Sequence, residues 1–438
     1  ENGITGIADQ AFNGCENLTN VSLPASVTAL GSSWLLNCTA VQQVTIDAAN
    51  PSFTSIDGTV FTKDMTKLVL VPQGKTSAFN VASTCTEIGD YAFYHSNANG
   101  PVIYDQVKTI DSYAFSGVKS NFKVYCLKDT PTDTYVKNNS IPYTYIYEYT
   151  TSGDGVTITK YNGPYSSPSV LTSINGKDVV AIGNEAFRGN TSLTAVYLYS
   201  PIASIGDYAF YGCTNMTKVS MPSTLTKIGD KAFYNCTKLD SLSLPAKLTN
   251  IGTYAFGYTA LESVKIPNSV TTLSSAAFYG CSKLSSVDLG TGVKTIGSYA
   301  FENTALTSQY IPKNVTSVGS NAFGYEYSDN THTRVTFDYI SGYPDSHAQT
   351  YAINNNITFK SVLDYSTGSD GNIIIDKYTG TDTNVVIPST IDGKPVTGIA
   401  GYAFNGTNVT SVTLPSSMTK LDGYAFYGAS KLTSVSIP

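Results

Sequence analysis

Apolar positions recur along the chain with a period of 22 or 23 residues. Each copy carries an Ala-Phe pair, or a close variant of it, that usually follows an Ile-Gly dipeptide, and 13 copies are present. Self-similarity at such a period is the signature of a repeat architecture, in which each copy packs against its neighbours. The pattern therefore predicts a solenoid. Its longest uninterrupted run carries the phenylalanines Phe187, Phe210, Phe233, Phe256, Phe278, Phe301 and Phe323.

The second half of each copy has the pattern of a short strand. After Phe210, the apolar residues Met216, Val219 and Met221 fall at relative positions 1, 4 and 6, and Pro222 follows. This is the spacing of a leucine-rich-repeat strand with one buried face and one solvent-exposed face. Proline ends the strand because it has no N–H to donate to the neighbouring strand. We therefore expect these strands to stack in a parallel sheet.

The first half of each copy, which carries the Ala-Phe pair, predicts a short helical or 3₁₀ turn opposite the sheet. Two residues after the isoleucine stands a residue type that favours helix N-caps, such as Asp207 or Asp230. We interpret these side chains as caps of their own turns, and not as catalytic or metal-binding carboxylates.

Cysteine follows the same period. Cys213 and Cys236 each lie three residues after a repeat phenylalanine, whereas threonine takes this place in copies whose turn is one residue shorter. Because a buried cysteine behaves as a small apolar residue, we predict that both thiols are buried and reduced, and we interpret Cys15, Cys38 and Cys281 in the same way. Disulfides between neighbouring rungs, Cys15–Cys38 or Cys213–Cys236, are the alternative that the sequence leaves open.

A longer duplication overlies the short repeat. Residues 134–143 match residues 350–359, and an Asp-Gly turn signal follows each segment. We predict a first array over 1–147, with a hairpin insertion at 50–80 and a terminal cap at 119–147. A second array covers 148–364 with a cap at 331–364, and a truncated third array begins at 365–438. Each cap is expected to be a strand-helix-strand unit, and the chain to be a segment of a longer protein.

Composition narrows the function classes. The 438 residues carry a formal charge of −6, only 13% are charged, and 32 are tyrosines. No basic block appears, which argues against nucleic-acid and anionic-membrane partners. No apolar run reaches the length of about 18 residues needed to cross a bilayer. The three histidines and scattered cysteines indicate no structural metal, and no nucleophile–base arrangement is visible. We expect no enzyme and no cofactor.

The motif I-G-x-x-A-F-x-G-C-x-x-L-x-x-V-x-[IL]-P, as in the copy from Ile205 to Pro222, resembles the BspA-type leucine-rich repeat family. The resemblance covers about three quarters of the chain. It implies a surface-exposed recognition scaffold, because members are mainly secreted or surface-attached bacterial proteins and several are adhesins. It also implies an extracellular or cell-surface location, with secretion and anchoring signals absent from this segment. No catalytic residue is carried over from the family.

The strand face of the longest array is the predicted binding surface. Polar side chains alternate with the buried ones on each strand, and stacking should assemble them into a continuous wall of the kind that solenoids use for binding. We predict an extracellular protein or glycan as partner and a monomeric state. The candidate binding residues are Tyr197, Lys218, Lys265, Asp288 and Tyr310.

Less specific interpretations stay open beside this one. The strand face can be merely solvated, and the chain can be a passive spacer in a larger surface protein. Tyrosines that flank the Ala-Phe pairs can bind sugars or proteins, but rung-to-rung packing is the interpretation we favour. Gln309 stands where an aliphatic residue is expected and predicts a local strand distortion. His332 and His347 are interpreted as surface loop residues.

Overall fold

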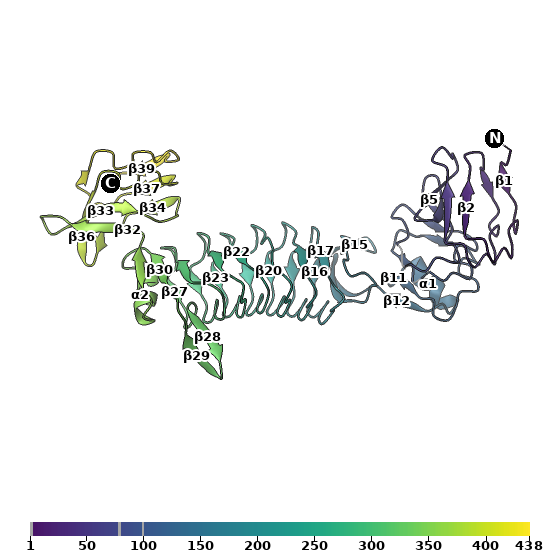
Figure 1. The fold of residues 1–438 in the computed structure, drawn as a ribbon, viewed down its shortest axis with the longest axis horizontal. Coiled ribbons are helices and arrows are strands. Elements are labelled where there is room, and N and C mark those ends of the chain that lie inside the picture. Colours follow the sequence, from purple (N-terminus) through teal and green to yellow (C-terminus); the bar gives the residue numbers. More distant parts are fainter. Residues whose placement is uncertain (1–2, 78–79, 99) are drawn as a thin grey trace. The chain divides into compact units, whose positions relative to one another are not determined.

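The protein is described by a computed structural model that covers residues 3–77, 80–98 and 100–438. It divides into two compact units, Glu1–Ala181 and Ile182–Pro438. Both are built from stacked rungs in which each repeat contributes one turn of the chain (Figure 1). The solenoid predicted from the repeat period is confirmed.

Unit 1 combines stacked rungs with one antiparallel insertion. Strands β5, β6 and β7 pair antiparallel, as expected for the hairpin insertion at 50–80, of which residues 78 and 79 lie outside the described residues. Its elements, up to β16 at the boundary, are β1 (Gly6–Ile7), β2 (Asn20–Leu23), β3 (Ala29–Leu30), β4 (Gln43–Ile46), β5 (Phe53–Ile56), β6 (Thr59–Thr62), β7 (Lys67–Leu70), β8 (Glu87–Ile88), β9 (Val102–Ile103), β10 (Thr109–Ile110), β11 (Val124–Cys126), α1 (Pro131–Asn138), β12 (Tyr143–Tyr145), β13 (Tyr147–Ser152), β14 (Gly155–Tyr161), β15 (Ser173–Ile174) and β16 (Lys177–Ile182).

Unit 2 holds the longest run of repeats. Its elements are β17 (Ala195–Tyr197), β18 (Ser204–Ile205), β19 (Lys218–Ser220), β20 (Lys227–Ile228), β21 (Asn250–Ile251), β22 (Ser263–Lys265), β23 (Thr272–Leu273), β24 (Ser286–Asp288), β25 (Thr295–Ile296), β26 (Ser308–Tyr310), β27 (Ser317–Val318), β28 (Tyr325–Ser328), β29 (Thr331–Arg334), β30 (Tyr339–Gly342), α2 (His347–Asn354), β31 (Phe359–Ser361), β32 (Leu363–Thr367), β33 (Ile373–Tyr378), β34 (Asn384–Val386), β35 (Thr390–Ile391), β36 (Lys394–Ile399), β37 (Ser411–Thr413), β38 (Lys420–Leu421) and β39 (Ser434–Ser436).

Unit 2 contains two kinds of parallel ladder. The isoleucine of each Ile-Gly dipeptide sits in a two-residue strand, and β18, β20, β21, β23, β25 and β27 pair in order. The strands of the second half of the repeat form shorter sheets, β17–β19, β22–β24 and β26–β30–β31. This second face, called the strand face below, carries the predicted binding residues.

The Ala-Phe segments are turns, and the part of the chain that the structure describes has helices only at α1 and α2. Tyr208 adopts a left-handed φ of 57°. The N–H groups of Tyr208, Phe210 and Gly212 donate to carbonyls of the next rung, at 2.8, 2.7 and 2.9 Å. A helix would keep these donors within its own turn, so stacking replaces the expected helical turn by a laterally bonded one.

The repeat phenylalanines form a continuous ring stack at the centre of unit 2. From Phe187 to Phe323 every one is fully buried, and neighbouring ring centroids lie 4.9 to 5.5 Å apart. Each ring is thus covered on both faces by the rungs beside it. The predicted core position is confirmed.

The residues interpreted as N-caps instead join neighbouring rungs. Asp207 Oδ1 accepts the backbone N–H of Asp230 at 2.8 Å, and Asp230 Oδ1 accepts that of Thr253 at 2.7 Å. A Cβ on Gly229 would collide with Asp207 Oδ1, which explains the glycine that precedes Asp230. The local-cap prediction is therefore wrong in its geometry, although the carboxylates are structural, as expected.

All seven cysteines, each within the described residues, are free thiols, and Cys213 and Cys236 are buried. Cys213 Sγ donates to Phe187 O at 3.1 Å, and Cys236 Sγ donates to Phe210 O at 3.2 Å. Burial raises the pKa of the Cys213 thiol to about 12, against a weaker lowering by a backbone hydrogen bond. The inter-rung disulfides are not formed in the structure, and only Cys15, in the first rung, is exposed.

Two strand-helix-strand units interrupt the rungs, as the duplication predicted. β11 and β12 pair in parallel around α1, and β30 and β31 pair in parallel around α2. At α1 the Thr130 side chain accepts the N–H of Asp133, a true N-cap. A hairpin that we did not predict, β28–β29, projects from the rungs just before the second unit (Figure 1). The division into three arrays stays a prediction.

Candidate functional site

The strand face of unit 2 holds the five predicted binding residues, but in separate groups. β17 and β19 bring Tyr197 and Lys218 together, with the Lys218 Nζ 5.5 Å from the Tyr197 ring centroid. Residues 239–245, the next rung, form no strand. A hollow of about 780 Å³ lies between that rung and β19.

The irregular rung at residues 239–245 interrupts the strand face, so the predicted continuous wall of polar side chains is wrong. Leu242 in the irregular rung is only half-buried, whereas its counterparts Val219 and Val264 are buried. The rung therefore packs less tightly against its neighbours, and the pair at Tyr197 is separated from Lys265, Asp288 and Tyr310. The structure brings these last three residues together in one place.

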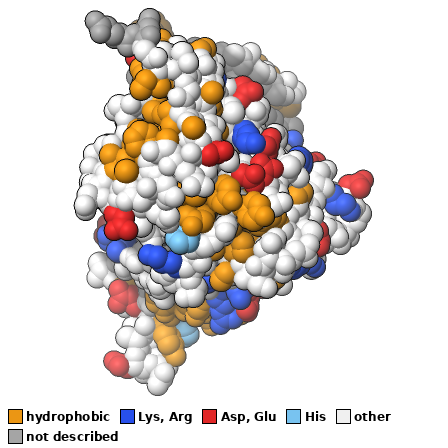
Figure 2. All heavy atoms as spheres, turned by 90° about the vertical axis from the view of Figure 1, so that its right-hand side faces the viewer, with side chains coloured by type: hydrophobic (Ala, Val, Ile, Leu, Met, Phe, Trp, Pro, Cys, Tyr) orange, Lys and Arg blue, Asp and Glu red, His pale blue; other side chains and the backbone are white. Residues whose placement is uncertain are grey.

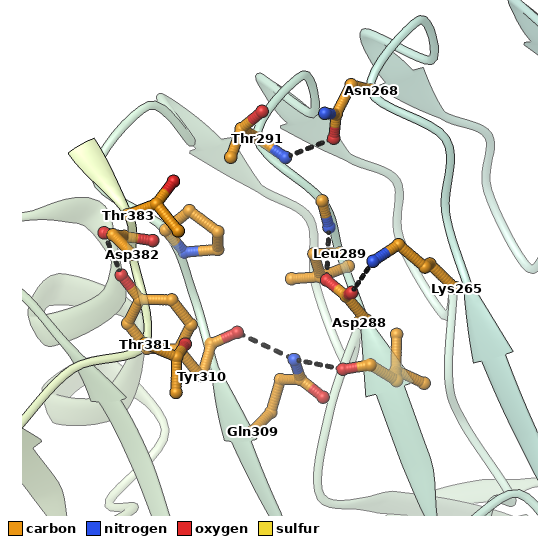
Figure 3. Close-up of a pocket in the computed structure, with 13 residues that line it drawn as sticks. Lys265, Asn268, Asp288, Leu289, Thr291, Gln309, Tyr310, Thr381, Asp382 and Thr383 are labelled. Carbon is orange, nitrogen blue, oxygen red and sulfur yellow. Dashed lines mark hydrogen bonds and ion pairs between the residues drawn. The ribbon is translucent and has the colours of Figure 1, made fainter. Parts of the chain in front are cut away.

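A second hollow, of about 450 Å³, lies where Lys265, Asp288 and Tyr310 converge (Figure 3). One wall comes from β22, β24 and β26, and the other from residues 381–383, in the segment between β33 and β34. We call it the Asp288 hollow. Three of the five predicted residues line the Asp288 hollow. This hollow is therefore the best-supported candidate site on the strand face.

The Asp288 carboxylate is held on two sides. Its Oδ2 lies 2.9 Å from Lys265 Nζ, directly opposite on the neighbouring strand, and its Oδ1 accepts the Gly290 N–H at 2.9 Å. Partial burial would raise the pKa of Asp288, but these hydrogen bonds outweigh it and leave that pKa below its usual value. Asp288 is thus a fixed, charged acceptor at the mouth of the hollow.

Tyr310 forms the opposite side and is more deeply placed than the sequence suggested. Its hydroxyl donates to Asp382 Oδ2 at 2.5 Å, and the Asp382 N–H donates to the Tyr378 hydroxyl at 2.9 Å. Burial first, and the Asp382 charge second, raise the pKa of Tyr310 well above its usual value. Tyr310 is therefore a rigid, neutral wall of the hollow.

Gln309, which stands where the repeat has an aliphatic residue, lies in the lining of the Asp288 hollow. This side chain is buried, and its Nε2 donates to Val287 O at 3.2 Å and to Tyr310 O at 2.7 Å. β24 and β26 belong to different sheets, and the Gln309 amide bridges them. The expected distortion is present, and the glutamine supplies the hydrogen bond that the interrupted ladder lacks.

A neighbouring hollow of about 490 Å³ shares Tyr310 and Thr381 with the first. It also includes Lys360, whose Nζ lies 3.6 Å from the Tyr339 ring centroid. None of the residues that β30, β31 and the 379–383 segment contribute to the two hollows was predicted. β30 and β31 belong to the cap of the same predicted array as β26, whereas residues 379–383 lie in the next array. No local sequence signal therefore places the 379–383 segment beside β26.

The turn edge, formed by the Ala-Phe turns, carries the tyrosines that flank the buried phenylalanines. Tyr211 and Tyr234 stack at 5.2 Å, and the Lys231 Nζ lies 5.6 Å from the Tyr208 and Tyr254 ring centroids. These rings face one another along the edge, which supports the rung-packing interpretation. On the face that Figure 2 displays, acidic and basic side chains are interspersed among hydrophobic and neutral ones.

A buried acid lies beneath the unpredicted hairpin. Glu302 has no exposed side-chain surface, and its Oε1 lies 2.5 Å from His332 Nδ1 on β29. The His332 ring lies 4.8 Å from the rings of Tyr299 and Tyr327. The other carboxylate oxygen of Glu302, Oε2, has no hydrogen-bond partner among the described residues. His332 lies at the surface, as expected, but in β29 and not in a loop, and its ring links the hairpin to the turn edge.

Glu302 gives the fold a predictable pH dependence. Burial raises the pKa of Glu302, and the partial compensation by His332 does not restore it. A proton thus binds more tightly to the folded state, so this contribution to stability is present at acid pH and is lost as pH rises. We expect the free energy of unfolding of Glu302→Gln, relative to that of the natural chain, to increase as pH rises from about 3.5 to about 7. Urea unfolding at several pH values measures this difference. A constant difference would contradict this, and Glu262→Gln, at an exposed site, is the control.

The stacked parallel strands and buried phenylalanine ladder place the protein in the class of leucine-rich-repeat solenoids. A model of the BspA type leucine rich repeat region matches residues 1–121, 73–167, 161–281, 203–330 and 377–438. The chain therefore belongs to the BspA-type leucine-rich repeat family, and the resemblance stated from its motifs is confirmed.

Three solved structures illustrate the likeness. A leucine rich cell surface protein of Faecalibacterium prausnitzii is 28% identical, with 67% of this chain and 75% of that chain covered and a TM-score of 0.41. A leucine-rich repeat protein of T. pallidum is also 28% identical, covering 49% of this chain and 95% of its own, with a TM-score of 0.37. One from Bacteroides ovatus is 19% identical, with 67% and 93% covered and a TM-score of 0.33. No curated protein was found to be similar to this chain.

Among the described residues, no group of three or more histidine, cysteine or acidic side chains is arranged to hold a metal ion. No helix in the described ranges has the length and apolar character needed to cross a membrane. The chemistry that the strand face offers is hydrogen bonding and ion pairing by fixed polar side chains.

Proposed function

We propose that this chain is a recognition scaffold of a bacterial surface or secreted protein, and that it binds an extracellular protein or glycan through the strand face of unit 2. One observation carries the proposal: Lys265, Asp288 and Tyr310, selected from the repeat pattern alone, line one hollow with a second wall from residues 381–383. Concave sites with a few fixed polar groups are where proteins bind ligands.

The supporting context comes from the family and its relatives. The chain belongs to the BspA-type family, and the similar protein of Faecalibacterium prausnitzii is described as a cell surface protein. We accordingly propose an extracellular or surface-attached location and a monomer. The function is binding: Asp288 and Asp382 are engaged in hydrogen bonds, and we assign no residue a catalytic role.

The test is a binding survey of the whole chain. Surface plasmon resonance against immobilised extracellular matrix proteins, with a glycan array in parallel, should reveal at least one saturable partner. A chain that acts as a passive spacer needs no such surface and would bind nothing in either survey. That outcome would overturn the proposal.

A further inference from the structure

The Asp288 hollow has the size and walls of a small-molecule site. Its volume of about 450 Å³ lies within the usual range for ligand pockets and suits on the order of one or two sugar rings. We propose that this hollow binds a neutral, hydroxyl-rich ligand, namely a glycan without acidic groups. This inference rests on the proposed function and names its ligand class.

The hydrogen-bonding groups of the lining match hydroxyl groups. The carboxylates of Asp288 and Asp382 are acceptors, and the Lys265 ammonium and the Asn268 amide are donors. The hydroxyl of Thr291, like those of Thr381 and Thr383, both donates and accepts. A sugar hydroxyl can also donate and accept, so it can form a hydrogen bond with either kind of group in the lining. A ligand that only accepts hydrogen bonds would gain nothing from the two carboxylates.

Charge argues against acidic ligands. The hollow presents two carboxylates, Asp288 and Asp382, against the single ammonium of Lys265. Lys265 is already paired with Asp288 at 2.9 Å, so it offers little uncompensated positive charge. A sialylated or sulfated glycan would bring like charges together, which costs free energy in a partly enclosed site. A neutral glycan avoids that repulsion.

None of the aliphatic side chains in the described lining is exposed as an anchor point for a protein partner. Leu289 and Pro312 are buried, and Val287 is half-buried. Binding hot spots between proteins centre on large side chains in desolvated apolar pockets. The lining also includes Tyr310 and the three threonines, whose ring and methyl groups can contact the C–H face of a sugar (Figure 3).

The polar groups are fixed before a ligand arrives. Gly290 N–H and Lys265 hold Asp288, and Tyr310 holds Asp382. Asn268 Oδ1 accepts the Thr291 N–H at 2.9 Å, which orients the amide. Because little side-chain freedom is lost on binding, an uncharged ligand can still bind measurably.

The experiment uses the whole chain and isothermal titration calorimetry. Neutral oligosaccharides of glucose, galactose, mannose and N-acetylglucosamine are compared with sialylated and sulfated counterparts. We expect binding to at least one neutral series, none to its acidic counterpart, and a loss of at least about tenfold in affinity in Asp288→Asn and in Asn268→Ala. Asp422→Asn, which breaks the exposed Lys420–Asp422 pair away from the hollow, should leave affinity unchanged.

The outcomes separate the two proposals. Binding of a matrix protein without any glycan, or preference for acidic glycans, would overturn the inference and leave the recognition function standing. Absence of any partner would overturn both. Circular dichroism of each variant shows whether the fold persists, and Asn268→Ala keeps the test decisive if Asp288→Asn unfolds, because Asn268 is exposed.

Discussion

Replacing Phe233 by Ala should lower the free energy of unfolding by about 3–5 kcal/mol. Phe233 has no exposed surface, and its ring stacks between Phe210 at 5.1 Å and Phe256 at 5.4 Å. Removing the ring leaves a cavity that the neighbouring rungs cannot close, since lateral hydrogen bonds of the Ala-Phe turns fix their spacing, as between Phe233 N and Ala255 O.

Urea unfolding followed by far-ultraviolet circular dichroism measures this change. Tyr427→Ala is the matched control, because this aromatic ring is 59% exposed on a turn of the same repeat type. We expect less than about 0.5 kcal/mol for the control. A loss below about 1 kcal/mol for Phe233→Ala would show that the ring ladder does not carry the core.

The second large effect concerns binding. Once a ligand is known, changing Tyr197, Lys218, Lys265 and Tyr310 together to Ala should weaken its binding at least tenfold, about 1.4 kcal/mol. Two of these residues line the Asp288 hollow, and tyrosine side chains supply much of the contact energy in binding sites. Lys218 stands over Tyr197, so that pair should act as a unit.

The control for this variant changes the same residue types elsewhere, at Tyr258, Tyr427, Lys238 and Lys283. Tyr310→Phe is needed as well, because the Tyr310 hydroxyl holds Asp382 and its loss can displace the second wall. Unchanged affinity in the fourfold strand-face variant would remove the strand face as the site. Attention would then move to the tyrosine-rich turn edge around Tyr208 and Tyr234.

The repeat period was enough to predict the fold and its core. Each buried phenylalanine recurs at the same place in the period, so one copy specifies the environment of all the others. The same reasoning placed Lys265, Asp288 and Tyr310 on one face, because successive strands in register align equivalent positions. The structure confirms the solenoid, the phenylalanine ladder and the two strand-helix-strand units.

What escaped prediction depends on contacts between rungs. The Asp207 carboxylate looks like a local cap in sequence, but its partner, the N–H of Asp230, lies one rung away. The only sequence feature that indicates the hairpin β28–β29 is its Asp329-Asn330 turn. The contact of its His332 with Glu302 joins residues far apart in sequence, so no local pattern predicts it. The 381–383 wall of the hollow likewise comes from a segment outside the longest array, and periodicity does not report where arrays meet.

Hydrogen–deuterium exchange of the whole chain, with and without the partner found in the binding survey, tests the central claim most directly. We predict that the bound partner slows exchange of backbone amides in β22, β24, β26 and residues 379–383, with no change along the turn edge from Tyr208 to Tyr279. Protection confined to that turn edge, or to unit 1, would contradict it.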